Sequence, residues 1–111
     1  MFSRLFSRSA SPTDVGHEDF EEAVKTGACA VVDVREPHEF ASGHIPDALN
    51  LPMSSFDPGK LPSGKPVVLI CQAGGRSRNA LGKAHANGRG DVKHYAGGMN
   101  GWRAHNGAVA R

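Results

Sequence analysis

The feature that most constrains this chain is an apolar run, Val67 to Ile70, that leads directly into Cys71. Three of its four residues are β-branched, which favours a strand that is buried on both faces. The small residues Ala73 to Gly75 follow, and from Arg76 the pattern favours a helix. A buried strand, a tight Gly-rich loop and the start of a helix together predict an anion-binding loop around a nucleophilic cysteine.

Segments of strand character alternate with segments of helical character along the rest of the chain. Ala30 to Val32 is apolar throughout, and Phe20, Ala23 and Val24 follow helical spacing. This alternation over short connections predicts an α/β fold with a mostly parallel sheet. We expect helices at 17–26, 37–41, 76–86 and 99–105, and strands at 14–15, 28–34, 48–51, 67–71 and 92–95.

The predicted topology places Cys71 at a binding site. Sheets of this kind bind ligands at the carboxyl ends of their strands, and Cys71 ends the most apolar one. A thiol attacks only as thiolate, so its ordinary pKa of about 8.5 must be lowered. Loop N–H groups, the helix N-terminus and Arg76 can each lower it. No histidine lies in the loop, and His85, His94 and His105 lack metal-ligand spacing, so we interpret them as surface or core residues.

Composition and charge restrict the class of protein. The 111 residues suffice for one domain, which we expect at 13–108 between tails at 1–12 and 109–111. Residues 1–59 hold four Lys/Arg and ten Asp/Glu, whereas residues 60–111 hold nine Lys/Arg and one acid, which suits a small anionic substrate. The basic residues are scattered and aromatic residues are few, so we expect no nucleic acid partner.

No apolar run approaches the ~18 residues of a membrane span, so we expect no membrane partner. Two cysteines do not make a disulfide framework, and no secretory signal pattern follows Met1, so the expected compartment is the reducing cytoplasm. Cys29 is interpreted as a packing residue, with a role as resolving thiol for Cys71 as the alternative.

The spacing between the cysteine and the arginine separates two kinds of chemistry. In cysteine-dependent phosphatases, the loop has one more residue between the nucleophilic cysteine and the arginine than this chain has between Cys71 and Arg76. The tighter loop fits a sulfur atom carried on the cysteine better than a phosphoryl group. Ser77 occupies the position of the phosphatase arginine and cannot replace its bidentate fork.

Four segments, in this order and spacing, resemble a single-domain rhodanese of the rhodanese homology superfamily. They are Val32 to Pro37, Gly43 to Pro52, Cys71 to Ser77 and Gly97 to Trp102. The resemblance extends from about residue 14 to residue 106. It implies a three-layer α/β/α fold around a mostly parallel five-stranded sheet, with two helices on one face and three on the other.

The resemblance also implies thiosulfate sulfurtransferase activity by double displacement, without metal or organic cofactor. We expect the protein to be a monomer. The thiolate would take the outer sulfur of thiosulfate, release sulfite, and pass the sulfur from a persulfide to cyanide or a thiol acceptor. Loop N–H groups would stabilise the persulfide charge, and Arg76 would hold the anionic donor. The site residues so predicted are Cys71 as nucleophile, Gln72, Ala73, Gly74, Gly75, Arg76 and Ser77 as the loop, and Asp33, Arg35 and His44 as its supports.

The sequence is also compatible with two other functions. The chain could be a sulfur-carrying or protein-binding module in which Cys71 accepts a persulfide from a partner protein, with little turnover of thiosulfate. A phosphatase or arsenate reductase is the more distant alternative, and the loop length argues against it.

Overall fold

The apolar run before Cys71 forms β3 (Val67–Ile70) in the computed structural model, which describes residues 12–111. This strand is central in a parallel sheet. All four residues of β3 are buried. The strand pairs with β1 (Ala30–Asp33) on one side and with β4 (Lys93–His94) on the other. β2 (Leu49–Asn50) pairs with the outer side of β1, so the strand order is β2-β1-β3-β4.

The predicted fifth strand is wrong, since the described residues form a four-stranded sheet. Asp14 makes a single parallel bridge with His94, next to the backbone hydrogen bond from Val15 N–H to the His94 carbonyl. Gly16 then caps the helix α2 (His17–Thr26), so the chain leaves the sheet after one bridge.

The helices occupy the predicted segments with shifts of one residue at most. They are α2, α3 (Pro37–Ala41), α4 (Gly75–Ala86) and α5 (Gly98–Ala104), and 3₁₀ turns lie at Met53–Ser55 and Pro58–Lys60. The strands are shorter than predicted. β1, for example, begins at Ala30 rather than Ala28, because the N–H of Ala28 donates to Ala23 at the end of α2.

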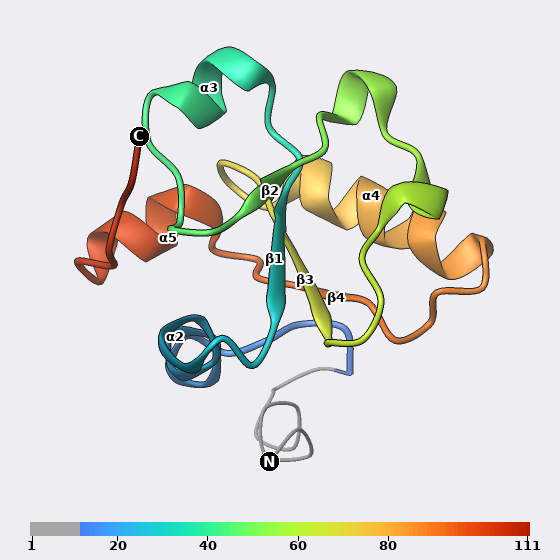
Figure 1. Ribbon diagram of the computed structural model, residues 1–111, viewed down its shortest axis with the longest axis horizontal. Coiled ribbons are helices and arrows are strands. Elements are labelled where there is room, and N and C mark those ends of the chain that lie inside the picture. Colours follow the sequence, from blue (N-terminus) through green and yellow to red (C-terminus); the bar gives the residue numbers. More distant parts are fainter. Residues whose placement is uncertain (1–11) are drawn as a thin grey trace.

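The sheet lies between two helical layers, as Figure 1 shows with α2 and α5 on one side and α4 on the other. On the first side, Phe20, Met99 and Trp102 pack in one cluster with Val68 and other residues of the sheet. On the second side, the predicted small-residue face of α4 packs against the sheet. That face consists of Ala80, Leu81 and Ala84, all buried. The α/β/α expectation is therefore confirmed.

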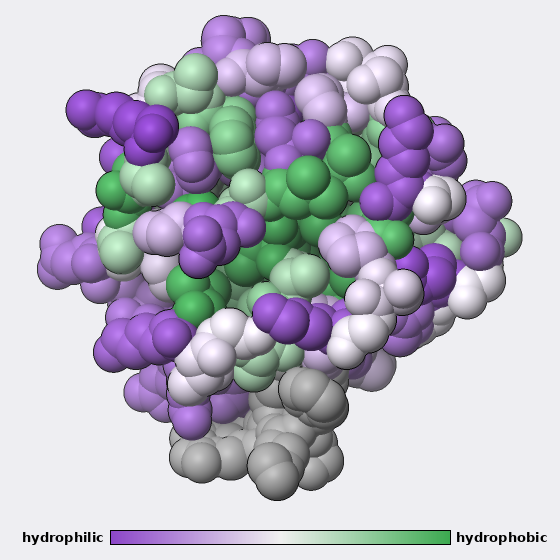
Figure 2. Space-filling view, in the orientation of Figure 1, coloured by the Kyte–Doolittle hydropathy of each residue, from purple (hydrophilic) through white to green (hydrophobic). Residues whose placement is uncertain are grey.

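The edge of the sheet formed by β2 leaves apolar surface exposed. On the face seen in Figure 2, hydrophobic residues gather over the middle of the molecule, where β2 lies in Figure 1, and hydrophilic residues surround them. Leu49 of β2 is 44% exposed. Among the described residues, no helix combines the length and the apolar character that crossing a membrane requires.

Of the two predicted tails, the structure describes the C-terminal one but only residue 12 of the N-terminal one. Residues 1–11 lie outside the described residues, so the structure says nothing of most of the first one. In the second, Ala110 and His44 exchange two backbone hydrogen bonds of 2.9 and 2.8 Å, and Arg111 Nε donates to the Ser42 carbonyl. Residues 110–111 thus contact the segment after α3.

Candidate active site

Cys71 lies directly after β3, at the carboxyl end of the sheet, and is 1% exposed. In Figure 1 the connection from β3 to α4 lies at the same end of the sheet as α3. The backbone N–H of Gly74 donates to Cys71 Sγ over 3.1 Å. Gly74 adopts a φ of 103°, a left-handed conformation that favours glycine, and it caps α4. The loop therefore curls back on its own thiol, as the Gly-rich sequence predicts.

The surroundings of Cys71 lower the pKa of its thiol. Burial, the largest single contribution, raises the pKa. Hydrogen bonds from the Ser77 side chain and from the backbone of Ser77, Gly74 and Ala73 together outweigh it, and they leave the pKa below its ordinary value. Cys29, by contrast, packs in the cluster of α2 and α5, and burial raises the pKa of its thiol to about 11. Of the two cysteines, only Cys71 has an environment that favours a thiolate.

The start of α5 supports the loop from the other side. Met99 N–H donates to the Cys71 carbonyl over 2.8 Å, and Asn100 N–H donates to the Gln72 carbonyl over 3.1 Å. Gln72 Nε2 also donates to Asn100 Oδ1. This contact needs glycine at Gly98, where φ is 63° and a Cβ would meet the Gln72 carbonyl and lie 2.7 Å from the Cys71 carbonyl oxygen.

Substitution of this glycine is expected to damage both the loop and the stability of the domain. Gly98→Ala should lower the free energy of unfolding by about 2–4 kcal/mol, because the new Cβ collides with backbone and φ is positive. Urea denaturation measures it. The control is Gly82→Ala in α4, where nothing lies within 4 Å of the added Cβ. There we expect a gain of about 0.5–1 kcal/mol. Equal stability of the two variants would contradict the account.

Asp33 and Arg35, both predicted to support the site, form a buried ion pair at the end of β1. Asp33 is 0% and Arg35 2% exposed, and Arg35 Nη2 lies 2.8 Å from Asp33 Oδ2. The same guanidinium donates to the Gly43 carbonyl over 2.8 Å and to Gln72 Oε1 over 3.2 Å. The pair thereby connects the end of the sheet with the loop, through Gln72.

His44, the third predicted support, is not brought to the loop. Its ring stacks on Phe40 with centroids 3.8 Å apart, and its Nδ1 lies 2.8 Å from the Phe40 carbonyl oxygen. Its backbone pairs with Ala110. These contacts tie α3 to the following segment.

Arg76, predicted to hold an anionic donor, is paired with a carboxylate that the sequence argument did not single out. Its Nη1 and Nη2 donate to Glu39 Oε1 and Oε2 over 2.6 and 3.0 Å. The hydrogen bond with Arg76 lowers the pKa of Glu39 to about 2. Glu39 belongs to α3, where its side chain also accepts from the N–H of Glu36 in a capping box. No local pattern could have identified Glu39 as the partner of Arg76, because the two residues lie 37 positions apart in the chain.

Ser77 contacts both the Cys71 thiol and His94, a residue that was not predicted to belong to the site. Ser77 Oγ lies 3.5 Å from Cys71 Sγ and 2.9 Å from His94 Nδ1. His94 Nε2 lies 2.8 Å from Asp14 Oδ1. His94, interpreted from the sequence as a surface or core histidine, is 0% exposed and lies directly behind Ser77.

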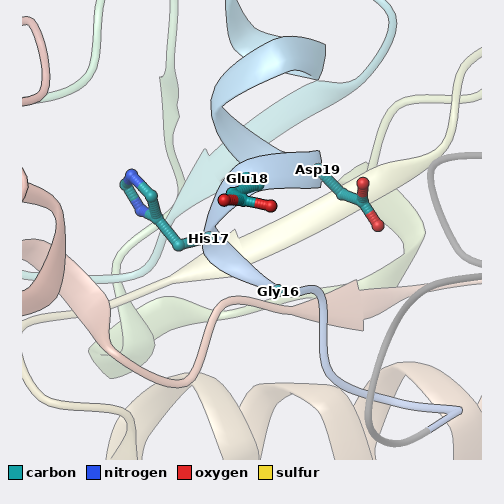
Figure 3. Close-up of a pocket in the computed structure, with 4 residues that line it drawn as sticks. All are labelled: Gly16, His17, Glu18 and Asp19. Carbon is teal, nitrogen blue, oxygen red and sulfur yellow. The ribbon is translucent and has the colours of Figure 1, made fainter.

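A separate hollow of about 250 Å³ lies at the start of α2 (Figure 3). Gly16, His17, Glu18 and Asp19 line it, and Figure 3 shows the side chains of His17 and Asp19 pointing to opposite sides of the helix. The His17 ring is engaged elsewhere, since its Nδ1 lies 2.8 Å from the Tyr95 hydroxyl. Among residues 12–111, those that line this hollow include none from the Cys71 loop.

Comparison with known proteins adds the following similarities. A family model described as rhodanese-like domain matches residues 16–105. The chain is 36% identical over 101 residues to an uncharacterized protein of Synechocystis, covering 89% of this chain and 56% of that protein. It is 39% identical to a sulfurtransferase of Allochromatium vinosum, covering 68% and 72%. It is 34% identical to the thiosulfate sulfurtransferase GlpE of Pseudomonas savastanoi, covering 75% and 80%.

Solved structures agree with the fold. A rhodanese-related protein from Thermoplasma volcanium superposes with a TM-score of 0.77 at 28% identity, over 88% of this chain and 97% of that one. The human single-domain sulfurtransferase TSTD1 gives 0.71 at 26% identity, over 85% and 97%. The chain thus spans nearly all of these structures, but only about half of the Synechocystis protein.

Proposed function

Since the chain belongs to the rhodanese-like domain family, we propose that it is a sulfurtransferase in which Cys71 carries the transferred sulfur as a persulfide. The observation that carries the proposal is the buried Cys71 thiol with a lowered pKa, which accepts a hydrogen bond from Gly74 N–H at the carboxyl end of β3. The relatives named sulfurtransferase and thiosulfate sulfurtransferase support the same reaction class.

The proposed reaction has two displacements at sulfur. The Cys71 thiolate attacks the outer sulfur of thiosulfate, the S–S bond of thiosulfate breaks, and sulfite leaves with the bonding electrons. The Cys71 persulfide then gives its outer sulfur to cyanide or to a thiolate acceptor, which regenerates the Cys71 thiolate. Gly74 N–H and the Ser77 hydroxyl lie where they can stabilise the charged sulfur. Both cysteines are free, which fits the reducing cytoplasm as the proposed compartment.

The direct test is the mass of the protein after exposure to thiosulfate. We expect release of sulfite and an added mass of about 32 Da, one sulfur atom, located on Cys71 by peptide mapping. Cys29→Ala should acquire the same adduct, because Cys29 packs on the other side of the sheet. Absence of the adduct from wild-type protein, or an adduct that persists in Cys71→Ser, would overturn the proposal.

The pairing of Arg76 with Glu39 affects how an anionic donor can bind. The ion pair already takes one N–H from each of Nη1 and Nη2 of Arg76, and the Glu39 carboxylate repels an approaching anion. Glu39→Gln keeps the side-chain shape and removes that charge. We expect the KM for thiosulfate to fall about threefold with kcat unchanged, a small effect because the pair is partly exposed. Steady-state kinetics at low ionic strength measures it.

The matched control for that variant is Glu36→Gln on the same helix segment. The Glu36 carboxylate accepts from Ser54 rather than from Arg76. A general effect of negative charge near the loop would lower the KM for thiosulfate in both variants alike. Such an equal response would contradict a specific competition between Glu39 and the donor for Arg76.

The same ion pair favours one second candidate, a sulfur carrier loaded by a partner protein. An Arg76 side chain held by Glu39 is less available to a small anion, whereas a protein donor can deliver its persulfide without using that guanidinium. Kinetics separates the two candidates. A very high KM for thiosulfate together with fast transfer from a protein persulfide would favour the carrier, and efficient turnover of thiosulfate would exclude it.

A further inference from the structure

Four side chains from separate segments form a continuous series behind the reactive sulfur. They are Cys71 after β3, Ser77 in α4, His94 in β4 and Asp14 in the segment before α2. Successive polar atoms lie 3.5, 2.9 and 2.8 Å apart, from Sγ to Oγ, from Oγ to Nδ1 and from Nε2 to Oδ1. Cys71, Ser77 and His94 are at most 1% exposed. Water is thus largely kept from the inner part of the series.

The donors and acceptors along the series determine where the protons lie. Nε2 of His94 and Oδ1 of Asp14 lie 2.8 Å apart, but they are not aligned as a hydrogen bond and neither atom has another partner among the described residues. The charge of the carboxylate favours the tautomer of the neutral ring that carries its proton on Nε2. In a neutral ring, Nδ1 is then an acceptor that faces the Ser77 hydroxyl. While Cys71 is a thiol, its S–H donates to Ser77 Oγ, and the Ser77 proton has two acceptors within reach, which are His94 Nδ1 and the Gly74 carbonyl oxygen. The single Ser77 proton cannot satisfy both at once.

We propose that Ser77 and His94 form the path by which Cys71 loses its proton, so that His94 is the base for the thiol and Asp14 its positioning partner. The thiol proton passes to Ser77 Oγ while the Ser77 proton passes to His94 Nδ1. The products are a Cys71 thiolate that accepts from the renewed Ser77 hydroxyl, and an imidazolium that donates to Ser77 from Nδ1 and forms an ion pair with Asp14. Protons and charge balance without any further reactant. The inference relies on the proposed function only in taking Cys71 as the reacting thiol.

The charges around His94 are consistent with this role. Burial, the largest contribution, lowers the pKa of His94, and the neighbouring charge of Arg78 in α4 lowers it as well. The negative charge of the neighbouring Asp14 raises it. The net pKa is below the ordinary value, so the ring is neutral near pH 7 and can accept a proton. A thiolate formed nearby then stabilises the imidazolium by direct attraction.

The test is the pH dependence of alkylation of Cys71 by iodoacetamide, measured in the full chain with Cys29→Ala so that one thiol reacts. We expect His94→Gln to move the midpoint of the rate profile upward by about one pH unit and to slow alkylation at neutral pH about tenfold. Ser77→Ala should behave in the same way. Because both act on one path, the double variant should be no slower than the slower single variant.

A histidine of purely structural importance would not move this profile. His85→Gln is the matched control, since His85 Nε2 bonds to the Val92 carbonyl and does not contact the loop. Its profile should match that of the wild type. A wild-type profile in a folded His94→Gln protein would overturn the proposal. Slowing factors of Ser77→Ala and His94→Gln that multiply in the double variant would also overturn it.

A second variant covers the possibility that loss of a buried histidine unfolds the protein. Asp14 is about one-third exposed, so Asp14→Asn removes the charge behind the imidazolium with little disturbance of packing. We expect a shift of the alkylation profile in the same direction and about threefold slower alkylation at neutral pH. An unchanged profile in this variant would contradict the proposal.

Alkylation requires no sulfur donor, so this test is independent of the proposed function. A shifted profile in protein that never acquires sulfur from thiosulfate would leave the proton path intact and overturn the sulfurtransferase. Normal sulfur loading of Cys71 together with unshifted alkylation profiles in the variants would support the sulfurtransferase and overturn the proton path.

Discussion

Replacing Cys71 by serine is expected to lower the rate of sulfite release from thiosulfate by at least about a thousandfold, or ~4 kcal/mol of transition-state stabilisation. A hydroxyl at this position ionises far less readily than the Cys71 thiol, whose pKa is already lowered by the loop. Serine also cannot form a persulfide that hands on its outer sulfur. The measurement is single-turnover sulfite release, because it does not depend on the choice of acceptor.

The control for this variant is the second cysteine. Cys29→Ala should release sulfite at nearly the wild-type rate, because burial raises the pKa of Cys29 to about 11 and its side chain packs against α2 and α5. Residual activity of Cys71→Ser above a few per cent of wild type, or a comparable loss in Cys29→Ala, would contradict the assignment of Cys71 as nucleophile.

Asp33→Asn is expected to destabilise the domain by about 3–5 kcal/mol, the largest effect that we predict on folding. The substitution leaves the Arg35 guanidinium, 2% exposed, without the carboxylate that binds it through both oxygens. Urea denaturation followed by circular dichroism measures it. The loop should loosen as well, because Arg35 also holds Gln72.

An exposed ion pair provides the comparison for Asp33→Asn. Asp91 pairs with Arg89 over 3.0 Å, but its side chain is 53% exposed. Asp91→Asn should therefore change the free energy of unfolding by less than about 1 kcal/mol. Replacing Asp33 and Arg35 together by apolar residues of similar volume should restore part of the loss of Asp33→Asn. Equal effects of Asp33→Asn and Asp91→Asn would refute the role of burial.

The local sequence pattern was sufficient to predict the part of the site that is contiguous in the chain, which is β3 and the loop after it. The apolar run Val67 to Ile70 has the character of a strand buried on both faces, and the small residues after Cys71 permit the turn around Sγ. The number of strands was predicted less well. The predicted start of α2 is correct, but Asp14 and Val15 pair with β4 through one bridge only, because the extent of pairing with a distant strand depends on tertiary packing.

The sequence by itself determined the parallel α/β fold, the position of Cys71 at the carboxyl end of the central strand and the Gly-rich loop around its thiol. These depend on side-chain periodicity and on contacts between residues a few positions apart. Only the tertiary structure decided that Glu39 holds Arg76 and that Asp14 and His94 stand behind Ser77. Those partners come from α3, from β4 and from the start of the domain, and packing of the helices on the sheet brings them together. Residue spacing along the chain does not predict such contacts. His94, interpreted from the sequence as a surface or core residue, therefore lies next to Ser77, whose hydroxyl contacts the reactive sulfur of Cys71.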